Sequence, residues 1–206
     1  MVQYLLDCGA DIHARNNMGQ CALWLACESC EKKTALLLLD RGADPQQRDN
    51  DGHNALMSAA ISGAKGIVKE LIRRGAPLDE QDDEGRSALY LATEYEEPDI
   101  VQLLLAAGAN RDLAAQNCHT PADCAKEEGY EILLAMLQDD GSTDSEQRVA
   151  ALKQRAALAR KLLQAAEDDE LKTVQELLSR GAAPSCTDDE GRTALMATGL
   201  RGLPSG

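Results

Sequence analysis

The chain has 206 residues, of which 44% are hydrophobic and 27% are charged, a balance typical of a folded protein rather than a disordered one. Its net charge of −14 argues against nucleic acid and against an anionic membrane surface as partners, because both attract clustered Lys and Arg. A basic protein or peptide fits this charge better. With no Phe and one Trp, the core must consist of small aliphatic side chains, which suit thin layers of closely packed helices.

The first residues of the chain do not have the pattern of a secretory signal. Residues 1–8 form an amphipathic segment, without a basic start followed by an apolar run. The longest apolar run, residues 35–39, is far too short to span a bilayer. The seven Cys are an odd number, and we interpret them as reduced thiols. These features predict a cytoplasmic or nuclear location.

The dipeptide Gly-Ala recurs along the chain with a fixed step. It begins at Gly9, Gly42, Gly75 and Gly108, each 33 residues after the last, and it occurs again at Gly181. Three other landmarks keep the same phase: an apolar pair before each Gly-Ala, a second Gly ten residues after most of them, and an Ala-Leu pair just beyond. Four landmarks at one exact step indicate an internal repeat.

Each unit predicts a turn, a helix, a short reversal and a second helix. In one unit Gly52 lies at the tip of the turn, a first helix covers about residues 55–62, and Gly63 lets the chain reverse. A second helix covers about residues 67–74, and Gly75 ends it in the left-handed region. One such pair cannot bury its apolar stripe alone, whereas stacked pairs can.

This pattern resembles the ankyrin-repeat family, which has a period of 33 and the motif Thr-Pro-Leu-His-x-Ala. The motif is degenerate here, and only Thr120-Pro121 keeps the Thr-Pro pair. The resemblance covers residues 1–137 and 155–199. It implies an all-α solenoid of stacked helix-turn-helix repeats.

The order of these features predicts three parts. Residues 1–138 are expected to form an ankyrin-repeat array, a half repeat plus four units, of which the last, near 118–137, resembles a capping repeat. Residues 139–147 are predicted to be an acidic linker. Residues 148–206 are expected to hold a helix that ends at about Ala166, an opening ankyrin repeat and a truncated repeat.

Both ends of the chain fall inside a repeat. The chain opens on a second helix, residues 1–8, and closes on a first helix within residues 188–206. The two half repeats could therefore complete each other, either within one chain or by head-to-tail self-association between chains. Closure within one chain would strain the linker, whereas closure between chains would not. The alternative is that the chain is a fragment with both half repeats frayed.

Several motifs suggest chemistry but lack the residues that would complete it. Cys27-x-x-Cys30 has zinc spacing, but no second pair of ligands follows, so we interpret these residues as structural thiols. The acidic turns 49–52 and 82–85 lack the twelfth-position acid of a calcium loop. The three His stand apart from any nucleophile or acid pattern. No catalytic, cofactor-binding or metal-binding residue is assigned, and the sequence predicts that the chain is not an enzyme.

The resemblance to ankyrin repeats implies a concave face, lined by the turn tips and by exposed positions of each first helix. The side chains there lean acidic with a few apolar points, so the expected partner is a basic or amphipathic protein or peptide. The alternative is that the acids only keep the solenoid in solution. The chain would then be a structural spacer, a scaffold segment or a fragment of a larger ankyrin-repeat protein, with little affinity of its own. The candidate partner-binding residues are Met18, Gln20, Trp24, Asn50, Asp51, His53, Ile61, Asp83, Glu84, Arg86, Tyr90, Glu94 and Tyr95.

Overall fold

The structure, a computed structural model, describes residues 1–139, 143–168, 170–183, 185–186, 193–194 and 196. The chain divides into two compact units, Met1–Asp139 and Asp140–Gly206. The described residues form helices and no strands, in agreement with the predicted all-α class. None of the described helices combines the length and the apolar character needed to cross a membrane.

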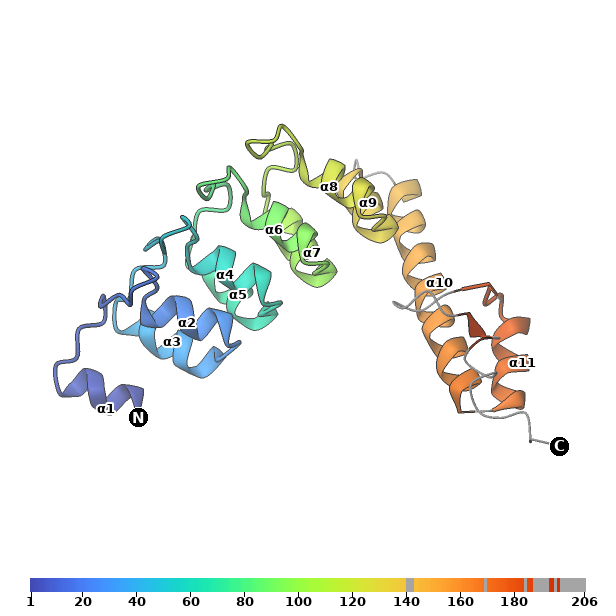
Figure 1. Cartoon of the computed structure of the whole chain (residues 1–206), viewed down its shortest axis with the longest axis horizontal. Coiled ribbons are helices and arrows are strands. Elements are labelled where there is room, and N and C mark those ends of the chain that lie inside the picture. The colour runs from blue at the N-terminus through green and yellow to red at the C-terminus, as the bar shows by residue number, and fades with distance from the viewer. Residues whose placement is uncertain (140–142, 169, 184, 187–192, 195, 197–206) are drawn as a thin grey trace. The chain divides into compact units, whose positions relative to one another are not determined.

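The first unit begins with a single helix and continues as four antiparallel helix pairs. Helix α1 (Val2–Asp7) is the single helix. The pairs are α2 (Ala22–Glu28) with α3 (Lys32–Asp40), α4 (Ala55–Ile61) with α5 (Lys65–Arg73), α6 (Ala88–Glu94) with α7 (Pro98–Ala106), and α8 (Pro121–Glu127) with α9 (Glu131–Leu137). In Figure 1 these pairs follow one another in chain order, and the loops that join them project from one side. First helices pack on first helices and second helices on second helices, as expected of a solenoid.

Small aliphatic residues at repeated positions form the core of this unit. Leu23, Leu56 and Leu89 lie one repeat apart in the first helices, and each is at most 2% exposed. Leu38 and Leu71 do the same in the second helices. Alanines fill the space between neighbouring first helices, which allows the helices to approach closely. The absence of Phe from the sequence follows from this thin, layered core.

Each first helix begins with a residue that caps its N-terminus, although the Thr of the ankyrin motif is mostly replaced. The side chains of Asn54, Ser87 and Thr120 each accept a hydrogen bond from the backbone N–H three residues later, at 3.0, 3.2 and 3.2 Å. Cys21 fills the same position, with its Sγ 3.5 Å from the N of Trp24. A short polar side chain is sufficient for this cap, so a degenerate motif still starts each helix at the right residue.

The reversal between the two helices of a pair requires a left-handed residue. Gly63 and Gly129 supply it with φ of +64° and +75°. Cys30 and Glu96 adopt φ of +55° and +53° at the equivalent positions, although side chains disfavour this region by about 1 kcal/mol. The repeat therefore imposes its turn even where the sequence lacks glycine.

The second unit contains α10 (Thr143–Glu167) and α11 (Leu171–Ser179). Its core consists of Leu158, Leu162, Ala165, Leu177 and Ala182, with Ala194 partly buried against them. Helix α10 includes residues 143–147, which the sequence assigned to the linker. The run Thr-Asp-Ser-Glu at its start has the composition that helix N-termini favour. The predicted truncated repeat lies mostly outside the described residues.

The cysteines differ in burial, and this predicts their order of reaction with alkylating reagents. Burial, with added repulsion from Cys21 and Cys30, raises the pKa of the Cys27 thiol to about 12. Since the thiolate is the reactive form, Cys27 should resist iodoacetamide at pH 8, whereas the exposed thiols of Cys8, Cys30 and Cys118 should be labelled first. Peptide mass spectrometry after timed labelling of the native chain measures this order. Labelling of Cys27 as fast as Cys30 would contradict the structure.

Candidate functional site

The tips of the loops between pairs are shaped by one side chain each. The Oδ1 atoms of Asn16, Asp49 and Asp82 lie one repeat apart, and each accepts two backbone N–H groups, from the residues two and four positions later. These distances lie between 2.7 and 3.1 Å. Such a bond fixes a tight turn, which explains why acids precede the tip glycines. Ala115 occupies the equivalent position in the fourth unit and cannot make it.

Successive tips are joined by backbone hydrogen bonds. The N–H groups of Asn50, Asp83 and Gln116 donate to the carbonyls of Met18, Asp51 and Glu84, at 3.0, 3.1 and 2.8 Å. Each tip is therefore bonded to the tip before it. At Gly52, with φ of +83°, a Cβ would meet the backbone N of Asp83 at 2.8 Å, so only glycine fits this close approach.

A second set of bonds between tips comes from long side chains one repeat apart. Arg15, Arg48 and Gln81 each donate to the carbonyl of their own tip glycine and to a carbonyl in the next loop, 33 residues along the chain. The sequence analysis did not identify these residues. Their signal was present in the step of 33 between three long hydrogen-bond donors, but the type changes from Arg to Gln.

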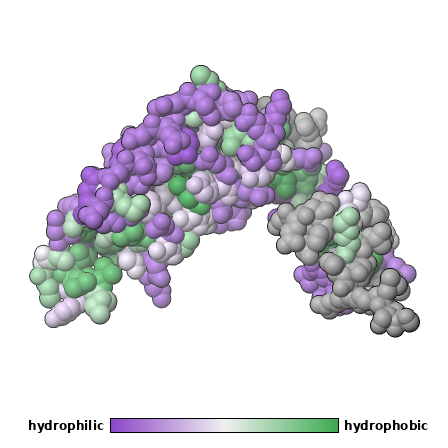
Figure 2. All heavy atoms as spheres, viewed as in Figure 1, coloured by the Kyte–Doolittle hydropathy of each residue, from purple (hydrophilic) through white to green (hydrophobic). Residues whose placement is uncertain are grey.

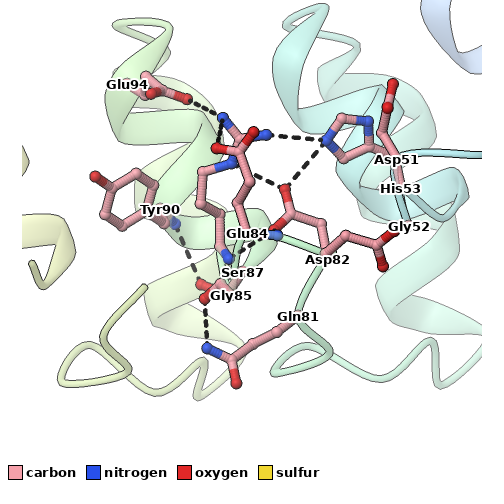
Figure 3. A network of polar contacts seen from close by, with 12 residues as sticks. Asp51, Gly52, His53, Gln81, Asp82, Glu84, Gly85, Ser87, Tyr90 and Glu94 are labelled. Atoms are coloured by element: carbon pink, nitrogen blue, oxygen red, sulfur yellow. Dashed lines mark hydrogen bonds and ion pairs between the residues drawn. The ribbon is translucent and has the colours of Figure 1, made fainter. Parts of the chain in front are cut away.

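A buried cluster of charges links the second and third tips. The carboxylate of Asp82 has no exposed side-chain surface, and its Oδ2 accepts a hydrogen bond from Arg86 Nε at 2.9 Å. His53 Nε2 lies 3.2 Å from the same oxygen. On its other side, His53 Nδ1 lies 3.5 Å from Asp49 Oδ2. Figure 3 shows the side chains of His53 and Asp82 pointing toward each other from neighbouring loops.

Arg86 connects this buried cluster to the surface. Its Nη1 lies 3.3 Å from a carboxylate oxygen of Glu84 and 3.4 Å from one of Glu94. Burial opposes the positive charge, but Asp82 and then Glu94 and Glu84 raise the pKa of Arg86 overall. The guanidinium is therefore held among acids, where it cannot swing out to attract an anion.

The structure places most of the candidate partner-binding residues along one surface. We use the name first-helix surface for the loop tips 16–20, 49–53, 82–86 and 115–119 together with the C-terminal ends of α2, α4, α6 and α8. The loop side of this unit is largely hydrophilic in Figure 2. The exposed candidates are Met18, Asn50, Asp51, Asp83, Glu84 and Tyr95, and the partly exposed ones are His53, Ile61, Arg86 and Glu94.

Three candidates are buried and need correction. Gln20, Trp24 and Tyr90 are only 9%, 7% and 5% exposed. Tyr90 packs against Ala115 and Cys124 of the next unit, so its ring is covered by the neighbouring repeat. A single unit cannot reveal such burial, because the covering residues lie one repeat away. These three side chains support the surface and offer little area to a partner.

Acids gather at the C-terminal ends of α6 and α8. Burial, together with Asp99 and Glu96, raises the pKa of the Glu97 carboxyl. Burial and then Glu96 and Glu128 raise the pKa of the Tyr130 hydroxyl. These shifts show that several negative charges act on one another across two repeats. Sequence reasoning included Glu94 in this region and did not select Glu96 or Glu97.

The possible metal ligands have other roles. Asp49, Asp51 and His53 could together offer three ligand atoms within 4.8 Å of one another. However, Oδ1 of Asp49 accepts the backbone N–H groups of Asp51 and His53, and these bonds account for the cluster as part of a turn. Cys27 is fully buried and Cys30 is exposed, with its thiol donating to the carbonyl of Ser62 at 3.2 Å. We therefore derive no metal site from either group.

The buried cluster generates a prediction for stability. Asp82→Ala should lower the free energy of unfolding by about 2–4 kcal/mol, because it leaves buried donors without an acceptor. Its exposed neighbour provides the matched control, and Asp83→Ala should change the stability by less than about 0.5 kcal/mol. Urea unfolding followed by circular dichroism measures both. Equal effects of the two substitutions would contradict a special role for Asp82.

Comparison with known proteins agrees with this geometry. A family model described as ankyrin repeats in three copies matches residues 1–82 and again residues 64–147, more than half of the chain. No curated protein matches the chain. Ankyrin repeats serve in general as protein-interaction modules and typically carry no catalytic activity. The matched residues contain the loops, caps and helix pairs described above, and the chain therefore belongs to the ankyrin-repeat family.

Proposed function

We propose that the chain binds a basic or amphipathic segment of another protein on the first-helix surface, which forms the concave face of the array. The observation that carries this proposal is the row of exposed acids on bonded tips. Asp51, Asp83 and Glu84 are exposed, and the backbone of each lies in a turn that is hydrogen-bonded to its neighbour. Negative charges held in fixed positions attract a basic partner without having to be ordered on binding.

Apolar side chains on the same surface provide anchors for such a partner. Tyr95 is 52% exposed and follows the end of α6, and Ile61 is partly exposed at the end of α4. Met18 is 60% exposed at the first tip. Interfaces gain most of their affinity from a few aromatic or apolar residues inside a polar rim. Acids around Tyr95 match a partner that places an apolar residue between Lys or Arg.

Charge reversal tests this proposal. The triple variant Asp51→Lys, Asp83→Lys, Glu84→Lys should keep the helical circular dichroism and nearly the same Tm, because exposed charges contribute little to stability. It should capture its partner from a cell extract more weakly than the parent chain, and the salt dependence of capture should become flatter. Crosslinking followed by mass spectrometry identifies the partner and the contacting residues.

A second triple variant controls for net charge. Asp44, Asp112 and Glu131 are exposed and lie outside the first-helix surface, so their replacement by Lys gives the same change in charge. This control should keep partner capture. If the Asp51, Asp83, Glu84 variant binds as well as the parent chain, the acidic surface is the wrong site. If neither parent nor control captures any protein, the spacer function becomes the better description.

A further inference from the structure

One end of the first unit exposes positions that every other repeat buries. Leu25 of α2 is 39% exposed, and Ala22 is also exposed. The residues at the position of Leu25 in the later units are Ser58, Leu91 and Cys124, at 2%, 0% and 6% exposed. Ser58 shows what covers this position, since its hydroxyl donates to the carbonyl of Trp24 in the preceding first helix. The face of α2 that carries Leu25 therefore lacks a preceding first helix.

Helix α1 exposes the matching apolar face. Leu5 is 50% exposed, whereas its equivalents Leu38, Leu71, Leu104 and Leu137 are at most 3% exposed. Met1 is 94% exposed, whereas Ile67, Ile100 and Leu133 are at most 2% exposed. In a complete pair these positions pack on the first helix of the same repeat. Figure 2 shows the hydrophobic residues gathered at this end of the unit.

The second unit carries the start of a first helix. Residues 188–195 repeat residues 82–89 with a single change, Thr193 in place of Ser87. Among the described residues, the N–H of Met196 donates to Thr193 Oγ1 at 3.4 Å, the same cap that begins the first helices of the array. Ala194 packs on the core of the second unit. The segment thus has the beginning of a first helix stacked on its preceding repeat.

Met196 lacks the cover that its equivalents have. It is 57% exposed, whereas Trp24, Met57 and Tyr90 at the same repeat position are at most 7% exposed. Tyr90 shows what provides that cover, because it packs on Cys124 of the following first helix. The residue equivalent to Cys124 at the start of the array is Leu25. Met196 and Leu25 are therefore the two halves of a contact that the array makes between its other repeats.

We propose that the first helix beginning at Thr193 in one copy of the chain docks against α1 and α2 of a second copy. In this head-to-tail contact Met196 packs on Leu25, and α1 becomes the second helix of the completed repeat. The contact uses the stacking face at the end of the array and is independent of the acidic first-helix surface.

The length of the connection favours a second copy over closure within one chain. Helix pairs stack at about 10 Å, so the second unit would have to lie about 50 Å from α9 to complete the repeat in the same chain. The connection 138–142 spans at most about 17 Å. The part of α10 that precedes its core residue Leu158 adds only about 22 Å. A second copy meets no such limit.

The contact joins two different faces, so each copy keeps one face open after docking. Interfaces of this kind extend into rings or open chains rather than stopping at a dimer. The weight-average mass of the full chain should rise above 22.1 kDa as its concentration is raised from about 1 µM to about 100 µM. Sedimentation equilibrium measures this rise. A mass that stays at 22.1 kDa throughout would overturn the proposal.

Two variants on opposite faces give the sharper test. Leu25→Asp removes the α2 face and Met196→Asp removes the other, and both residues are exposed in the folded chain. Each variant alone should stay monomeric with an unchanged Tm. An equal mixture should form a 1:1 dimer of twice 22.1 kDa and nothing larger, because each variant keeps one working face. A mixture that stays monomeric, or variants that still associate alone, would refute head-to-tail docking.

The matched control is Ala106→Asp in the middle of the first unit. Ala106 is exposed at the end of α7, and the equivalent positions in earlier repeats already carry Asp7 and Asp40. This variant should associate like the parent chain. If it loses association as Leu25→Asp does, the effect comes from added charge, and the docking of these two faces is wrong.

Discussion

The first unit depends on hydrogen bonds between loop tips that recur once per repeat. Each tip donates a backbone N–H to the tip before it, and a long side chain adds a bond to a carbonyl in the next loop. Helix pairs of Leu and Ala could slide along their small, similar surfaces. The bonded tips prevent this, because a shift of one residue would break every bond in the series. The helices supply the buried apolar area, and the loops fix their register.

The described helices of the first unit follow closely from the sequence, because each depends on local signals. Helix α4 was predicted at about 55–62 and is observed at Ala55–Ile61, since Asn54 caps its start and Gly63 ends its pair-mate's approach. The left-handed backbone at Cys30 also follows from its phase in the repeat. Features within one repeat were therefore predictable from composition and spacing alone.

The site was less predictable, because its features arise between repeats. Tyr90 is buried by residues of the next unit, and His53 meets Asp82 from the next loop. Neither relation has a signal in the local sequence of its own repeat. The exposure of Leu25 has the opposite origin, since its equivalents are buried and only the missing neighbour leaves it bare. Placing side chains on a solenoid surface requires the adjacent repeats as well as the residue's own phase.

The bonds between tips end on backbone carbonyls, and this has a consequence for how such a protein diversifies. Every residue type carries a carbonyl, so the bond survives whatever side chain the acceptor residue bears. Arg and Gln both serve as donors, at Arg48 and Gln81, which shows that even the donor tolerates exchange. Genetic duplication of a whole repeat would therefore create a unit that joins its neighbours at once. Substitutions at the exposed tips can then alter recognition while the architecture is inherited unchanged.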